Sequence, residues 1–335
     1  MLLKKFNIIT RMSIISIALS LCLVISVVLA LGLGSSGHGL ADVWNWLWGN
    51  DNNSMMDAII WRIRLPRVLM AAMAGAVLAL GGLVFQALLR NPLAEPYILG
   101  VSGGAAIGAI IGILAGLARF PGVGLMAFIG SMATLVVVLL MSSKDTSMKK
   151  DTVILSGVMV NAFCSAVIMF LISMTTDSKI HNIMFWLMGD LSSADLPQAG
   201  LLFVLILPCF ILIFILSHAM NLLLLGREMA KSMGVNTKRV TALLLIATSF
   251  MISAAVCQCG LLGFVGLVIP HIFRLSLGPD HRVLVPACIL GGASYMVICD
   301  LLARWIPQQG EMPAGVITAM IGAPLFIYLL KRERR

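Results

Sequence analysis

Residues 64–100 read RLPRVLMAAMAGAVLALGGLVFQALLRNPLAEPYILG. An apolar run, residues 68–89, lies between a charged start that holds Arg64 and Arg67 and a polar end that opens at Arg90. A helix needs about 20 apolar residues to cross a hydrocarbon core of about 30 Å. The stretch therefore predicts a transmembrane helix with polar chemistry at both of its ends.

The composition extends this prediction to the whole chain. Of the 335 residues, 60% are hydrophobic and 11% are charged, and the mean hydropathy is +1.04. These values lie outside the range of soluble domains. The long apolar runs favour helices over a membrane barrel, whose strands are about ten residues long. We expect an all-α polytopic membrane protein with a single transmembrane domain over residues 1–335.

About ten apolar segments are predicted to span the membrane. They are residues 13–33, 66–89, 96–116, 122–142, 152–174, 196–217, 238–259, 261–277, 284–303 and 313–330. The first is expected to be an uncleaved span, because its apolar run is too long for a secretory signal. The eighth is the weakest, since Pro270 and the polar residues after it leave an uninterrupted apolar run of only 261–269. Either it is a broken helix buried among others, or the count is nine.

The Lys and Arg residues predict the orientation. With the N-terminus in the cytoplasm, 17 of the 23 Lys and Arg residues are cytoplasmic and six lie outside: Arg62, Arg64, Arg67, Arg119, Lys179 and Arg304. The positive-inside rule then places both termini in the cytoplasm. Topology and lipid headgroups explain the formal charge of +9, and the absence of basic patches that alternate with aromatic residues excludes nucleic acid as a partner.

Glycine recurs at every fourth residue of the third span, at Gly100, Gly104, Gly108, Gly112 and Gly116. A step of four residues advances about 40° beyond a full turn, so these glycines face different directions. The pattern predicts a central helix in close contact with several others. The alternative is a helix that bends or lines a pathway.

Sequence motifs for catalysis or metal binding are missing. The seven cysteines all fall within predicted spans and are interpreted as small apolar residues. Cys257 and Cys259 form no metal or redox pair in this interpretation, because residues two apart face different sides of a helix. No P-loop, zinc motif or nucleophile elbow is present. The few intramembrane carboxylates and the lack of His, Asp or Cys clusters argue against a secondary transporter and a membrane enzyme.

Two features could bind partners. Arg64, Arg67 and Arg304 lie outside against the overall charge bias, so they either anchor the helices to lipid phosphates or receive the carboxylates of an acidic partner. Inside, residues 225–234 predict a short amphipathic helix that Gly234 ends. This helix is either a connector on the membrane surface or an insert for the groove of a cytoplasmic partner.

Six motifs stand in order between Arg64 and Leu330. They are Arg64-Leu-Pro-Arg67, Gln86 with Arg90-Asn-Pro-Leu-Ala-Glu-Pro96, Leu99-Gly-Val-Ser-Gly-Gly-Ala105, Gly263-Phe-Val-Gly-Leu-Val-Ile-Pro-His-Ile-Phe-Arg274, Asp280-His-Arg282 and Glu311-Met-Pro-Ala-Gly315. Together they resemble the FecCD family, the permeases of bacterial iron-chelate and cobalamin importers. One departure is Cys257-Gln-Cys-Gly260, where that family usually has smaller apolar residues.

The resemblance implies the type II ABC importer permease fold in the bacterial cytoplasmic membrane. Its implied partners are a second copy or a close paralogue, two cytoplasmic ABC ATPase subunits that bind ATP and Mg, and an extracytoplasmic substrate-binding protein. The chain itself is expected to be a transport subunit without enzymatic activity, cofactor or metal. Of the possible ligands we expect a ferric siderophore first, cobalamin second and haem third.

The resemblance also implies residue roles. Arg64, Arg67 and Arg304 would receive acidic residues of the binding protein, and changing Arg64 and Arg67 to Glu is expected to weaken docking without unfolding the permease. A coupling helix at about 222–234 would enter the ATPase through Gly226, Arg227, Glu228, Met229, Ala230 and Gly234. Asn91 and Leu93 would form a cytoplasmic gate. Asn161 and Thr318, on the fifth and tenth spans, would line the pathway at the dimer interface.

Overall fold

The computed structural model describes residues 7–33, 54–142, 150–307 and 310–333. Within these ranges the chain is helical and has no strand. Six of the Lys and Arg residues assigned to the cytoplasm lie outside the described residues: Lys4, Lys5, Lys144, Lys149, Arg334 and Arg335.

The helical segments of the described residues follow one another along the chain. Their bounds are α1 Ile8–Gly32, α3 Ser54–Ile59, η2 Ile60–Arg64, α4 Leu65–Leu89, α5 Val101–Leu114, η3 Arg119–Val123, α6 Gly124–Ser142, α7 Lys150–Ser173, α8 Asp177–Leu187, α9 Leu196–Ile215, α10 Ser217–Leu225, α11 Arg227–Ser232, α12 Thr237–Cys259, α13 Val265–Leu277, α14 His281–Trp305 and α15 Ala314–Glu333.

Ten apolar helices correspond to the ten predicted segments. In the described part of the chain, seven helices are long and apolar enough to cross a membrane, and α5, α13 and the apolar part of α15 are shorter. The eighth segment becomes α13, a helix of 13 residues. Its first seven residues, 265–271, are all buried. The eighth segment is therefore a short helix that continues through Pro270 and has its first half buried among other helices.

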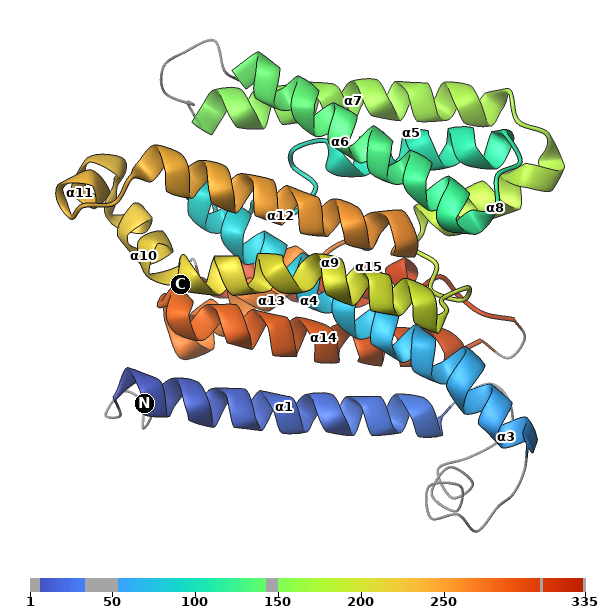
Figure 1. The fold of residues 1–335 in the computed structure, drawn as a ribbon, viewed down its shortest axis with the longest axis horizontal. Coiled ribbons are helices and arrows are strands. Elements are labelled where there is room, and N and C mark those ends of the chain that lie inside the picture. Colours follow the sequence, from blue (N-terminus) through green and yellow to red (C-terminus); the bar gives the residue numbers. More distant parts are fainter. Residues whose placement is uncertain (1–6, 34–53, 143–149, 308–309, 334–335) are drawn as a thin grey trace.

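Helix α4 forms the centre of the bundle and crosses it obliquely (Figure 1). It packs against α14, α13, α12 and α9. At the crossing with α14, a Cβ on Gly75 would overlap the carbonyl of Gly292, and a Cβ on Gly292 would overlap Ala79. Glycine at both positions lets the two backbones approach closely, which strengthens van der Waals packing where no hydrophobic driving force acts between helices.

Helix α5 contacts several neighbours through its glycines. A Cβ on Gly104 would overlap the Gly130 carbonyl of α6, and one on Gly108 would overlap the Met126 carbonyl of the same helix. A Cβ on Gly100 would lie 3.1 Å from Val160 of α7 and one on Gly112 3.2 Å from Val123 of η3, both tighter than ordinary contact, whereas Gly116 has open space around it. Most of this glycine series therefore serves close packing, and Gly116 ends it at the surface.

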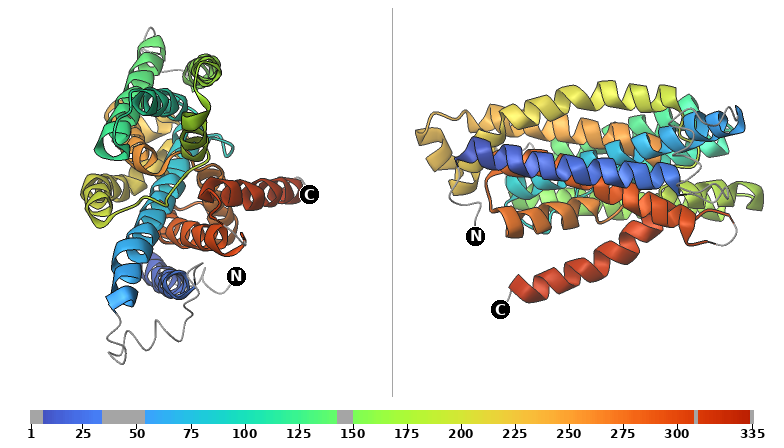
Figure 2. Two further views of the ribbon diagram at one scale, coloured as in Figure 1. Left: turned by 90° about the vertical axis from the view of Figure 1, so that its right-hand side faces the viewer. Right: turned by 90° about the horizontal axis from the view of Figure 1, so that it is seen from below.

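The bundle has two ends, which we name by their residues. The arginine end holds Arg64 and Arg67 at the start of α4 and Arg304 at the end of α14, and the α11 end holds α10 and α11. Both chain termini lie at the α11 end (Figure 1), and the C-terminal part of α15 projects away from the other helices (Figure 2). An even number of crossings accounts for both termini lying at one end.

Candidate functional site

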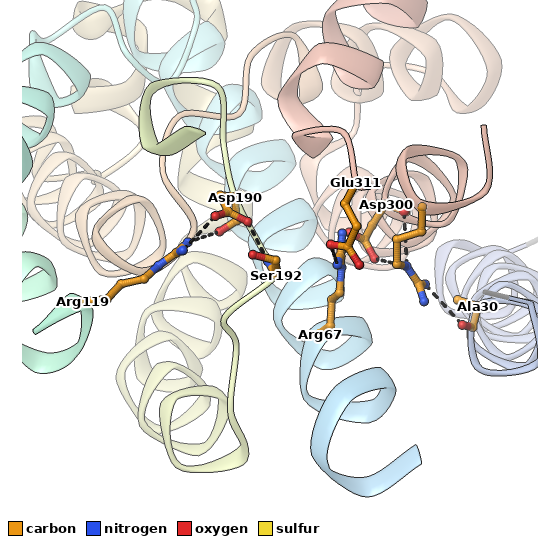
Figure 3. Close-up of polar contacts among 8 residues, drawn as sticks. Ala30, Arg67, Arg119, Asp190, Ser192, Asp300 and Glu311 are labelled. Atoms are coloured by element: carbon orange, nitrogen blue, oxygen red, sulfur yellow. Dashed lines mark hydrogen bonds and ion pairs between the residues drawn. The ribbon is translucent and has the colours of Figure 1, made fainter. Parts of the chain in front are cut away.

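The arginine end contains a buried ion-pair cluster, shown in Figure 3. The Nε of Arg67 donates to Asp300 Oδ1 at 2.8 Å, and its Nη1 donates to Glu311 Oε2 at 2.5 Å. The second oxygen of Asp300 lies 3.1 Å from Nε of Arg304, one turn further along α14. Asp300 therefore connects α4 and α14 across 233 positions of sequence. Its role could not be read from the sequence, because its partners are not its neighbours there.

The other two arginines of this end bind the backbone of α1. Arg304 Nη2 donates to the Ala30 carbonyl at 3.2 Å, and Arg64 Nη1 donates to the Leu31 carbonyl. Both carbonyls belong to the last turn of α1, whose final carbonyl groups lack partners within the helix. The structure thus brings the three sequence-predicted arginines together and uses them to hold α1, α4 and α14 to one another.

Burial changes one expectation from the sequence. Arg64, Arg67 and Arg304 are only 3%, 4% and 5% exposed. A glutamate in place of Arg67 would stand against the carboxylates of Asp300 and Glu311, and removing one partner of a buried pair is strongly destabilising. For Arg67 the structure therefore argues against the expectation that the Glu variant leaves the fold intact, and we expect this variant to lower the free energy of unfolding. Of the side chains in this cluster, Glu311 is the most accessible to a partner, since it is 36% exposed.

A second polar site at this end lies beside α8. Arg119 Nη1 pairs with Asp190 Oδ2 at 2.8 Å, and Ser192 N–H donates to the other oxygen of Asp190 (Figure 3). Burial alone would raise the pKa of Asp190, but the Arg119 charge and the Ser192 hydrogen bonds outweigh it and lower that pKa. A cavity of about 550 Å³ opens here, lined by Arg119, Lys179, His181 and Trp186 among others. In the sequence, Arg119 and Lys179 were distinguished only as two of the six positive residues predicted to lie outside the cytoplasm.

At the α11 end, the predicted helix at 222–234 is two helices. Gly226 has φ of 124° and ψ of 151°, which separates α10 from α11 and limits α11 to six residues. The exposed surface of this unit includes three large apolar side chains, because Leu225, Met229 and Met233 are 64%, 54% and 57% exposed. Glu228 and Lys231 form an ion pair of 2.8 Å on the surface, which contributes little to stability.

The proposed gate residues lie in the turn that follows α4. Asn91 Oδ1 accepts a hydrogen bond from Leu93 N–H at 2.9 Å, an Asx-turn arrangement that fixes the shape of the loop. Leu93 is 49% exposed and points away from the core. The residue before them, Arg90, reaches α10, where its Nη2 donates to the Leu223 carbonyl at 2.6 Å.

The rest of this loop folds back into the bundle and meets the break between α12 and α13. The Tyr97 hydroxyl donates to the Leu262 carbonyl and accepts from the Leu262 N–H, each at 3.0 Å. Glu95 Oε1 accepts from Phe264 N–H at 3.3 Å. Burial raises the pKa of Glu95, and the Phe264 hydrogen bond offsets part of that rise. These contacts satisfy irregular backbone inside the bundle, where no water can do so.

The two residues predicted to line the pathway differ in their surroundings. Asn161 is half-buried on α7, and its Oδ1 lies close to Gly103 of α5. Thr318 is fully buried on α15, where its hydroxyl donates to the Gly315 carbonyl at 3.0 Å. Within the single chain, Thr318 is a packing residue with no surface for a ligand. Among the described residues, no three His, Cys, Asp or Glu side chains are grouped so that they could hold a metal ion.

Comparison with known proteins identifies the family of this chain. The model of the FecCD transport family matches residues 22–332. The chain belongs to the FecCD transport family. A family member, the vitamin B12 import system permease protein BtuC of Salmonella typhi, is 41% identical over 281 residues, which cover 83% of this chain and 85% of the relative. The corresponding protein of Salmonella arizonae is 40% identical over 285 residues, which cover 84% and 86%.

Solved structures confirm the fold of this FecCD protein. A metal-chelate type ABC transporter in an inward-facing conformation superimposes with a TM-score of 0.84 at 34% sequence identity, over 95% of this chain and 99% of that one. The PsaBC structure from Streptococcus pneumoniae in complex with Fab gives a TM-score of 0.54 at 13% identity and shows a shared fold alone. The chain is a multi-pass permease subunit of a type II ABC importer, as the sequence predicted.

Proposed function

We propose that this chain is the permease of an ATP-driven importer that carries cobalamin, a cobalt chelate, across the bacterial cytoplasmic membrane. The observation that supports this ligand most is the 41% identity to a vitamin B12 permease over 83% of the chain. The resemblance to the family places a ferric siderophore first, because such importers are the most abundant in it. The relatives favour cobalamin, which therefore replaces it as the proposed ligand.

The pathway is proposed to form between two copies of the chain. In the single chain, α7 carries four large apolar side chains that are 59–74% exposed, Met159, Phe163, Met169 and Phe170, and Met174 just after the helix is 72% exposed. Methionine is flexible and adapts to irregular shapes, so a passage lined by such residues suits a bulky ligand that must bind weakly. The affinity for the ligand would then reside in a separate binding protein.

The energy is proposed to come from two ATPase subunits at the α11 end. With this end in the cytoplasm, 17 of the 23 Lys and Arg residues are cytoplasmic, in agreement with the positive-inside rule. The exposed apolar side chains of Leu225, Met229 and Met233 suit a hydrophobic groove on such a partner. ATP and Mg would bind to that partner and not to this chain.

The binding protein is proposed to dock at the arginine end. Three arginines and two carboxylates give the cluster a net charge of about +1 when all are ionised. A carboxylate of the binding protein would take the place of Glu311, the exposed member, beside Arg67. Docking would then exchange one carboxylate for another, which limits the desolvation cost of the interface.

Transport into vesicles tests the proposal. The chain is reconstituted with its ATPase and binding protein, and ATP-dependent uptake of labelled cobalamin and a labelled ferric siderophore is measured side by side. We expect cobalamin to accumulate and the siderophore not to. Uptake of the siderophore alone would replace the proposed ligand, and uptake of neither by an assembled, ATP-hydrolysing complex would refute both.

A further inference from the structure

Arg90 occupies a conformation that is costly for its residue type. It ends α4 with φ of 47° and ψ of 41°, the left-handed region. Glycine adopts this region at helix ends without penalty, whereas other residues pay about 1–2 kcal/mol. A residue other than glycine in this conformation needs another interaction that compensates for its cost. The guanidinium provides one, because it donates to the Leu223 carbonyl of α10 at 2.6 Å.

The contact joins two elements at their ends. Leu223 lies in the last turn of α10, and its carbonyl accepts both from Gly226 N–H at 3.3 Å and from Arg90, at a helix end where a cation is favourable. The backbone of Arg90 is fixed to α4 at the same time, since its N–H donates to the Ala87 carbonyl at 3.3 Å. One residue therefore ties the end of α4 to the unit that contains α11.

Arg90 also begins the turn that holds the gate residues. The next residue is Asn91, whose side chain accepts from Leu93 N–H and whose carbonyl accepts from Ala94 N–H. These hydrogen bonds make residues 91–94 a compact turn. A displacement of Leu223 that is passed to Arg90 would therefore move the whole turn.

A second polar contact holds the opposite side of α10. Asn221 Nδ2 donates to Asp280 Oδ1 at 2.8 Å, and Asn221 Oδ1 accepts from His281 N–H at 2.8 Å. Asp280 precedes α14, the long helix whose other end carries Asp300 and Arg304. With α10 attached to α14 on one side, rotation of α10 would displace Arg90 on the other.

We propose that Arg90 is a positioning residue that transmits movement of α10 and α11 to the 91–94 turn. The inference rests on the proposed function, in which an ATPase moves α11 and residues 91–94 close the pathway. It adds a specific link between those two parts. Without the guanidinium, the ATPase would still move α11, and the turn would no longer follow.

The experiment uses the whole complex in lipid nanodiscs or vesicles, with Arg90→Gln, Arg90→Lys and a control. The control is Lys331→Gln, which removes an exposed cation near the end of α15, the helix that projects away from α10. Three quantities are measured: ATP hydrolysis, labelled cobalamin taken up per ATP, and the ATP-dependent change in distance between spin labels at position 93 of the two copies. The distance needs no knowledge of the ligand.

We expect Arg90→Gln to assemble and hydrolyse ATP while uptake per ATP falls about tenfold, the factor that loss of one charge-assisted hydrogen bond can produce. The ATP-dependent change in the label distance should be lost with it. Arg90→Lys, which keeps the charge but has a single donor group, should lie between wild type and Arg90→Gln. Lys331→Gln should match wild type in all three quantities.

Two results would overturn the inference. One is an unchanged distance response and unchanged uptake per ATP in Arg90→Gln. The other is an equal loss of assembly, hydrolysis and uptake in both Arg90 variants, which would make the residue only structural. A wild-type complex whose labels respond to ATP but which takes up no cobalamin would instead count against the proposed ligand, and the distance measurements would still decide the role of Arg90.

Discussion

Replacing Asp300 with leucine tests whether the buried cluster holds the arginine end together. The Asp300 side chain is 1% exposed and lies 2.8 Å from Arg67 and 3.1 Å from Arg304. Leucine has the same branched shape and number of heavy atoms but is bulkier and carries no charge. After the change Arg67 keeps Glu311, whereas Arg304 keeps its 3.2 Å contact to the Ala30 carbonyl and loses its carboxylate.

The expected loss in the free energy of unfolding depends on which charged groups keep an ion-pair partner after the substitution. Removing one partner of a buried ion pair costs about 3–5 kcal/mol, because the other charge stays buried and uncompensated. Since Glu311 still neutralises Arg67 in Asp300→Leu, we expect a value near the lower limit, about 3 kcal/mol. Adding Arg304→Met removes the charge that was left without a carboxylate, so the double variant should recover about 1–2 kcal/mol of that loss.

The assay is a denaturant titration of the purified chain in detergent. The free energy of unfolding is compared among wild type, Asp300→Leu, Arg304→Met and the double variant. Glu228→Leu is the control, because its carboxylate is 86% exposed and should contribute less than about 1 kcal/mol. The reasoning fails if Asp300→Leu unfolds at the wild-type denaturant concentration, or if the two single losses simply add in the double variant.

Three further predictions concern the other polar contacts. Tyr97→Phe leaves the N–H and carbonyl of Leu262 without the hydroxyl and should lower the free energy of unfolding in the same titration by about 1–3 kcal/mol. Glu311→Gln removes the carboxylate that pairs with Arg67, so Arg67 should bind a carboxylate of the binding protein more readily. The affinity for the binding protein, measured by surface plasmon resonance, should rise by up to about fivefold. Met229→Asp places a charge on the exposed apolar side of α11 and should reduce copurification of the ATPase, whereas normal copurification would argue against α11 as its docking element.

The sequence predicted the number of apolar helices well. It predicted less well how long each of them is. Hydropathy assigned residues 96–116 to one crossing, but α5 has only 14 residues, about 21 Å of helix at 1.5 Å per residue. The residues before Val101 form the irregular loop that meets Leu262 through Tyr97. A hydropathy window measures how apolar a segment is. It does not detect that a segment can lie inside the bundle as loop when side chains satisfy its backbone.

The candidate sites likewise contain some residues that the sequence signals and others that only the fold brings together. Arg64, Arg67 and Arg304 were noticed because they violate the charge bias, a signal contained in the sequence itself. Asp300 gave no such signal, since one acid in a helix of 25 residues is unremarkable until its arginine partners are placed beside it. Contacts between distant segments, such as Arg90 with Leu223, depend on the fold and cannot be found from spacing.

The irregular segments explain how the two ends of the bundle can influence one another. Residues 90–100 contact α10 through Arg90 and the α12–α13 break through Tyr97. The break in turn contacts the end of α8, where Leu261 N–H donates to the Trp186 carbonyl at 3.4 Å, and the start of α15 donates to the adjoining Gly189 carbonyl at 3.1 Å. Glycines bring backbone against backbone at these contacts, and such close packing shifts between discrete arrangements more readily than it deforms gradually. A movement of α10 that Arg90 passes on would therefore reach α8 and α15 as a displacement of whole segments.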